Sequence, residues 1–262
     1  ELTPHFWRAP TDNDRGNMMH IRTAAWKNIG NELTIKFFQR SLSNNVVKIK
    51  IIANHAPTES IITITYNIFG NGLIDIEQEL VTEKETLPEL PRFGMKMTLP
   101  KDFNRVSWYG RGPHESYWDR KTSAPIKVYS GTVWEQTYPY VRPQETGNKT
   151  DVRWMGLDNG TIGMLAIGQP LFDGSVHQYP YLDLENVPGD KRHGKLDIKP
   201  KEQIDWLIDY RQTGIGGDNS WGARTHQKYT LDGKSANYKY HFYLIPFTKG
   251  VDIMALSKIN MN

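Results

Sequence analysis

"SIITITYNIFGNGLIDIEQEL", residues 60–80, contains two runs in which apolar and polar side chains alternate. This period of two is typical of a β-strand that turns one face toward a protein core. A Gly-Asn-Gly turn at residues 70–72 separates the two runs, so the stretch predicts a β-hairpin. The side chains expected on the core face are Ile62, Ile64, Tyr66 and Ile68 in the first strand, and Ile74, Ile76, Gln78 and Leu80 in the second.

The same period recurs along the chain, whereas helical spacing is found only in a short piece at residues 18–30. The 15 prolines and 22 glycines fit many turns and no long helix. Further alternating sets are Val47, Ile49, Ile51 and Ala53; Ile204, Trp206 and Ile208, alternating with Asp205, Leu207 and Asp209; and Tyr238, Tyr240, Phe242 and Leu244. We therefore predict an all-β fold, a large antiparallel β-sandwich, and not a (β/α)₈ barrel.

The composition narrows the classes of partner. The 262 residues are 38% hydrophobic, enough for one large core, and the net charge of +3 is scattered, which argues against nucleic acid or a membrane surface as partner. The absence of cysteine excludes disulfides, thiolate metal sites and a cysteine nucleophile. No apolar run is long enough for a membrane span, so we expect a soluble protein, and the sequence leaves open whether its compartment is the cytoplasm or the periplasm. The start at Glu1 suggests a piece of a longer protein.

Side chains that could carry chemistry are dispersed. The eight histidines are far apart, and none pairs at metal-ligand spacing with a further ligand, so no metal site is predicted. Carboxylates are numerous, but nothing indicates that two of them face each other across a glycosidic bond. There is no G-x-S-x-G nucleophile motif.

"TGIGGDNSWG", residues 213–222, allows three interpretations. A phosphate-binding loop is disfavoured, because no Lys-Ser/Thr pair and no amphipathic helix follow Gly214, Gly216 and Gly217. The stretch is then either a structural turn that holds Trp221 or a turn that presents its ring to a ligand, since the face of tryptophan stacks on the C–H face of a sugar.

Four stretches together resemble the C-terminal domain of the large, lactose-cleaving β-galactosidases of glycoside hydrolase family 2. They are "FWRAPTDNDRG" (6–16), "WYGRGPHESYWDR" (108–120), "YPYVRPQETGNKTDVRW" (138–154) and "GIGGDNSWG" (214–222), and their order and spacing run through nearly the whole chain. The chain departs from the pattern at Ser116 and Thr146, where asparagine is expected, and at Trp118, where proline is expected.

The resemblance implies one supersandwich domain over residues 1–262, similar to galactose mutarotases, within an enzyme that hydrolyses terminal β-D-galactosides with retention. It places the catalytic glutamates and the magnesium ligands in a (β/α)₈ domain that this chain does not contain. No catalytic residue, cofactor or metal is therefore expected here, and the isolated chain is expected to be inactive. The expected partners are the other domains of the enzyme, its β-galactoside substrate and further copies in a homo-oligomer.

The resemblance also assigns Trp221 to the wall of the sugar site in the barrel domain. Gly216, Gly217, Asp218, Asn219 and Ser220 are then expected to support the loop, the last three through side-chain to backbone hydrogen bonds. Two alternative functions stay open. The first is a stand-alone carbohydrate-binding module. The second is an aldose mutarotase, which needs a histidine acid and a glutamate base, and His177 and Glu185 are the only pair close in sequence that could fill these roles.

Overall fold

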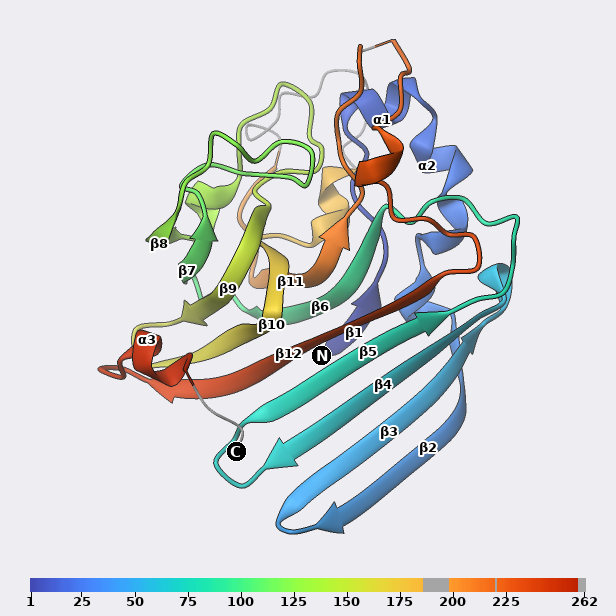
Figure 1. Cartoon of the computed structure of the whole chain (residues 1–262). Coiled ribbons are helices and arrows are strands. Elements are labelled where there is room, and N and C mark those ends of the chain that lie inside the picture. The colour runs from blue at the N-terminus through green and yellow to red at the C-terminus, as the bar shows by residue number, and fades with distance from the viewer. Residues whose placement is uncertain (186–197, 220, 259–262) are drawn as a thin grey trace.

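The computed structural model describes residues 1–185, 198–219 and 221–258 (Figure 1). The strands in this part of the chain are β1 (Leu2–His5), β2 (Leu33–Ser43), β3 (Val46–His55), β4 (Ser60–Phe69), β5 (Ile74–Val81), β6 (Arg92–Pro100), β7 (Arg105–Arg111), β8 (Ile126–Thr132), β9 (Lys149–Asp158), β10 (Ile162–His177), β11 (Gln203–Gln212) and β12 (Asn237–Thr248). The α-helices are α1 (Asp12–Gly16), α2 (Met19–Arg22) and α3 (Ile253–Leu256). No helix of the described residues has the length and apolar character needed to cross a bilayer.

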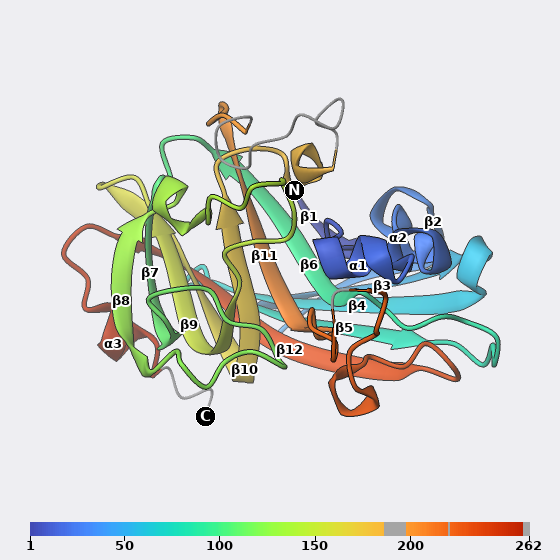
Figure 2. The ribbon, with the colours of Figure 1, turned by 90° about the horizontal axis from the view of Figure 1, so that it is seen from above.

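The antiparallel sheet forks at β10. Residues 162–169 of β10 pair with β12, residues 173–177 pair with β11, and β9 lies on the other edge. One branch continues from β12 through β5, β4 and β3 to β2, and the second from β11 through β6 to β1. A third runs from β9 through β7 to β8. Figure 2 shows the branch that contains β11, β6 and β1 above the one that contains β12, β5 and β4.

The predicted hairpin is confirmed. β4 and β5 pair with Ile62 opposite Leu80, and the turn closes where the amide of Phe69 donates to the carbonyl oxygen of Leu73 at 2.9 Å. Gly72 has φ +86°, a left-handed conformation that glycine adopts without strain.

The core lies between the two branches, which confirms the predicted β-sandwich. The ring of Phe93 in β6 packs 5.3 Å from that of Tyr240 in β12, and the Tyr240 hydroxyl donates to the carbonyl oxygen of Ile208 in β11 at 2.9 Å. The fully buried core side chains from the two branches are Ile62, Ile76, Leu80 and Phe242 on one side, and Phe93, Met95, Ile204, Trp206 and Ile208 on the other. Alternation in sequence thus produces two apolar faces that cover each other.

The outer part of the larger branch departs from the predicted pattern. Of the four side chains expected on the core face of β3, only Ala53 is buried, and the other three are half-buried. In β2, Phe38 is 60% and Leu42 72% exposed. The reason is the shape of the opposite branch, which ends at the four-residue strand β1 and leaves β2 uncovered among the described residues.

β11 also departs from the predicted alternation of buried and exposed side chains, because both faces of this strand are buried. Asp205, Leu207 and Asp209 alternate with the core residues, yet all three are 0% exposed. On this second face Asp209 forms an ion pair with Arg92 at 3.1 Å. Burial raises the pKa of the Asp209 carboxyl well above its ordinary value, although the positive charge of Arg92 lowers this pKa. A polar network therefore occupies a face that alternation alone would assign to solvent.

Candidate functional site

The glycine-rich loop begins where β11 ends, and an arginine of the first stretch holds its start. The Arg8 guanidinium donates to the carbonyl oxygens of Thr213 and Gly214, the latter at 3.1 Å. Asp14 fixes this guanidinium with a bidentate pair at 2.9 and 2.7 Å. Asp14 itself completes a capping box with Thr11 at the N-terminus of α1. Because Arg8 is 1% exposed, this anchor is shielded from water.

An aspartate of the second stretch holds the next residues of the loop. The carboxylate of Asp119 accepts hydrogen bonds from the amide of Ile215 at 3.1 Å and from the amide of Gly216 at 2.7 Å. It also accepts one from the hydroxyl of Thr225, which follows the loop, at 3.3 Å. The sequence offered no signal for this contact, because about a hundred residues separate its partners.

The third stretch, residues 138–154, contacts the first stretch near the glycine-rich loop. The amide of Glu145 donates to the carbonyl oxygen of Ala9 at 3.1 Å, and the amide of Asp12 donates to the side-chain oxygen of Gln144 at 3.2 Å. All four stretches that carry the family resemblance therefore meet around one loop. Figure 1 shows this loop, after β11, standing beside α1.

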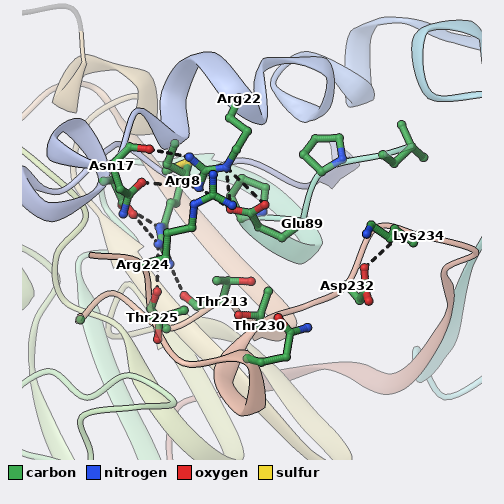
Figure 3. A pocket seen from close by; sticks show the side chains of 18 of the residues that line it. Arg8, Asn17, Arg22, Glu89, Thr213, Arg224, Thr225, Thr230, Asp232 and Lys234 are labelled. Atoms are coloured by element: carbon green, nitrogen blue, oxygen red, sulfur yellow. Dashed lines mark hydrogen bonds and ion pairs between the residues drawn. The ribbon is translucent and has the colours of Figure 1, made fainter. Parts of the chain in front are cut away.

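Two concavities flank the loop. One, of about 380 Å³, is lined by polar side chains that include Asp12, Asn13 and Gln144. Donors and acceptors of this kind suit the hydroxyl groups of a sugar. The other, of about 460 Å³, lies on the side of Arg8, Arg22 and Arg224. Figure 3 shows Arg22 there, with its guanidinium turned to Glu89, and the two form an ion pair.

The loop presents the ring of Trp221 to solvent. This side chain is 91% exposed, whereas the fully buried tryptophans of the chain, such as Trp206, lie in its core. The amide of Trp221 donates to the side-chain oxygen of Asn219 at 2.9 Å. Gly222 has φ +108°, and a Cβ atom there would lie 3.1 Å from the carbonyl oxygen of Gly16. The ring does not pack in the core, which agrees with the interpretation of the loop as a turn that presents the ring to a ligand.

The residues expected to support the loop have different surroundings. The amide of Gly216 binds Asp119, and a Cβ atom on Gly217 would lie 2.5 Å from the carbonyl oxygen of Ala223. Asp218 pairs with His226 at 2.8 Å. The side-chain oxygen of Asn219 accepts the hydrogen bond from the backbone amide of Trp221, whereas the partner of Asp218 is a side chain. Ser220 lies outside the described residues.

The acid and base pair considered for a mutarotase is not brought together in a cleft. His177 is 0% exposed, and its ring nitrogens lie 3.2 Å from the Tyr179 hydroxyl and 3.3 Å from the Ser175 hydroxyl. Burial lowers the pKa of His177 to about 3, with further lowering by nearby positive charges. Glu185 is engaged elsewhere, by the indole nitrogen of Trp7 and by Lys27 at 2.6 Å. Across the described ranges, no three histidine or carboxylate side chains gather as metal ligands would.

Comparison with known proteins connects this geometry to a family. Residues 1–244 match the model of the beta galactosidase small chain. The beta-galactosidase of Priestia megaterium (strain DSM 319 / IMG 1521) is 38% identical over 231 residues, which cover 87% of this chain and 22% of that protein. The beta-galactosidase of Lactobacillus delbrueckii subsp. bulgaricus is 32% identical over 235 residues, covering 88% and 22%.

Among solved structures, a galactose 1-epimerase from Lactobacillus acidophilus NCFM matches with a TM-score of 0.45 and 8% identity, over 81% of this chain and 66% of that one. The chain spans about 22% of the length of the two beta-galactosidases named above. With a family match over residues 1–244, the chain belongs to the beta galactosidase small chain family.

Proposed function

We propose that this chain is the C-terminal domain of a β-galactosidase that hydrolyses terminal β-D-galactose residues with retention, and that Trp221 forms part of the wall of its sugar site. The relatives bear the name beta-galactosidase and are several times longer than this chain, which supports a role within a larger enzyme. The observation that carries the proposal is a 91% exposed tryptophan ring on a loop whose start is held by a buried arginine.

The chemistry of the proposed reaction needs two carboxyl groups. One protonates the glycosidic oxygen as the leaving group departs, and the other attacks the anomeric carbon to form a covalent galactosyl intermediate, which water then hydrolyses. We assign both groups, and the magnesium ligands, to a (β/α)₈ domain outside these 262 residues. This chain would then supply recognition and not proton transfer.

Stacking is the contribution that Trp221 can make. The face of an indole ring packs against the C–H face of a galactose ring, an interaction worth ~0.5–1.5 kcal/mol beyond area burial, by analogy with aromatic pairs. Such an energy affects binding but is too small to replace general acid catalysis. The bonds of Arg8 and Asp119 hold the loop before a ligand arrives, and this lowers the entropy lost on binding.

The test is steady-state kinetics on the full-length enzyme. Trp221→Ala should raise KM for lactose more than it lowers kcat, because binding shared by the ground state and the transition state appears in KM. Trp221→Phe should recover part of the loss. The matched control is Phe38→Ala, which removes another exposed aromatic ring, 60% exposed on β2, and should leave both constants unchanged. An unchanged KM for Trp221→Ala would contradict the proposal.

A stand-alone carbohydrate-binding module is the second candidate, since an exposed ring on a loop whose first residues, Ile215 and Gly216, line a polar concavity of about 380 Å³ is also suited to bind a sugar unaided. Calorimetric titration of the 262-residue chain with a β-galactoside separates the two. Saturable binding by this chain alone would favour the module, and negligible binding would favour the completing domain.

A further inference from the structure

Asp119 lies in a turn that is fixed by its own backbone. The amide of Tyr117 donates to the carbonyl oxygen of Arg120 at 2.9 Å, and the amide of Arg120 donates back to the carbonyl oxygen of Tyr117 at 2.8 Å. These two bonds enclose residues 118 and 119. The carboxylate of Asp119 therefore projects from a constrained backbone.

The neighbouring Trp118 connects this turn to both stems of the loop. The guanidinium of Arg211, at the end of β11, lies 4.4 Å from the centre of a Trp118 ring. Tyr229, beyond the loop, packs edge-on against Trp118 at 5.9 Å, and its carbonyl oxygen accepts from the amide of Gly214 at 2.7 Å. Trp118 stands where the family resemblance leads one to expect proline, so this chain has packing contacts here that proline could not make.

The glycines of the loop make room for the Asp119 carboxylate. A Cβ atom on Gly214 would lie 2.7 Å from Oδ2 of Asp119, and a Cβ atom on Gly216 would lie 3.0 Å from the same oxygen. Such contacts are too close for any side chain without displacement of the carboxylate. Gly214 and Gly216 thus permit the approach that the bonds to Ile215 and Gly216 require.

We propose that Asp119 is the positioning residue of Trp221: it joins the backbone before the exposed ring to Thr225 after it, and so fixes where the ring stands. The inference rests on the proposed function, because it concerns the place of the ring in the sugar site. Asp119 acts through the loop and need not touch the substrate.

The test compares Asp119→Asn, Trp221→Ala and the double variant in the full-length enzyme. Asparagine keeps the shape of aspartate but loses one of its two acceptor oxygens. Asp119→Asn should speed amide hydrogen exchange in the peptide that contains residues 215 and 216, as read by mass spectrometry. It should also raise KM by about two- to tenfold, as Trp221→Ala does, with a smaller change in kcat. The double variant should have the KM of Trp221→Ala alone.

Two further variants serve as a second test and as a control. Gly216→Ala places a methyl group against the carboxylate from the loop side and should reproduce Asp119→Asn. Asp102→Asn changes an exposed aspartate whose carboxylate accepts from Asn159 at 3.0 Å, and it should alter neither exchange nor KM.

The outcomes separate the two claims. If Trp221→Ala raises KM but Asp119→Asn leaves KM or the exchange rate unchanged, the positioning role is wrong and the proposed function stands. A full additional effect of Asp119→Asn in the Trp221→Ala background would also overturn it, because Asp119 would then act independently of the ring. If Trp221→Ala leaves KM unchanged, the proposed function fails, and this inference fails with it.

Discussion

Replacing Asp173 with asparagine should stabilise the folded chain above neutral pH. Asp173 lies in β10 directly opposite Asp209 of β11, and the two are 5% and 0% exposed. Oδ2 of Asp173 has no hydrogen-bond partner among the described residues. Burial raises the pKa of the Asp173 carboxyl to about 7, although the charge of Arg211 lowers it. Ionisation of this carboxyl is therefore opposed by the fold.

The magnitude follows from the two pKa values. A rise from the ordinary 3.8 to about 7 is equivalent to ~4 kcal/mol, at about 1.36 kcal/mol for each pH unit. The folded state binds this proton more tightly than the unfolded state, so the stabilisation is complete below pH 3.8 and is lost as the pH rises to about 7. Asparagine does not ionise, and Asp173→Asn removes the loss. Its gain over the parent should be under about 1 kcal/mol at pH 4 and should approach ~4 kcal/mol at pH 8.

Urea unfolding of the 262-residue chain and of Asp173→Asn, at pH 4, 6 and 8, measures this difference. Comparing the two proteins at each pH cancels the other titrating groups that they share. Asp102→Asn, at an exposed position, is the control and should show no trend with pH. A gain that is equal at all three pH values, or a parent that is more stable at pH 8, would refute the reasoning.

Three further predictions concern folding, activity and packing. The purified 262-residue chain should give the far-ultraviolet dichroism of a β-rich protein and should hydrolyse no chromogenic β-galactoside; turnover that survives removal of host enzyme would contradict this. Trp221→Ala should change the free energy of unfolding by less than about 0.5 kcal/mol, because the ring is 91% exposed, whereas Trp206→Ala, at 0% exposure, should cost ~3–5 kcal/mol in a urea melt. Gly94→Ala should also lower the urea midpoint, because its Cβ atom would lie 2.0 Å from Oδ1 of the buried Asp209.

The strands could be predicted because their signal is local. Within residues 60–80, the alternation predicts two strands and the Gly-Asn-Gly segment predicts the turn between them, and the structure has β4 and β5 there. Which strands cover each other is not local. The sequence therefore did not indicate that the side chains of Phe38 and Leu42 in β2 would be exposed, or that Asp209 would be buried against Arg92.

The candidate site was predicted only in part, for a related reason. The family resemblance identified Trp221 and its glycines, but it did not explain the glycines. The close approach of Asp119 explains Gly214 and Gly216, and Asp119 reaches Gly216 only because the fold brings two distant segments together. Arg8 is another anchor of this kind, and its pairing with Asp14 required the structure.

The central claim is that the ring of Trp221 lies in the wall of the sugar site, and chemical protection tests it most directly. In the full-length enzyme, the rate of oxidation of Trp221 by N-bromosuccinimide can be followed by mass spectrometry, with and without a saturating non-hydrolysable β-thiogalactoside. We expect the bound galactoside to slow oxidation of Trp221. An oxidation rate that is the same with and without the ligand would contradict it.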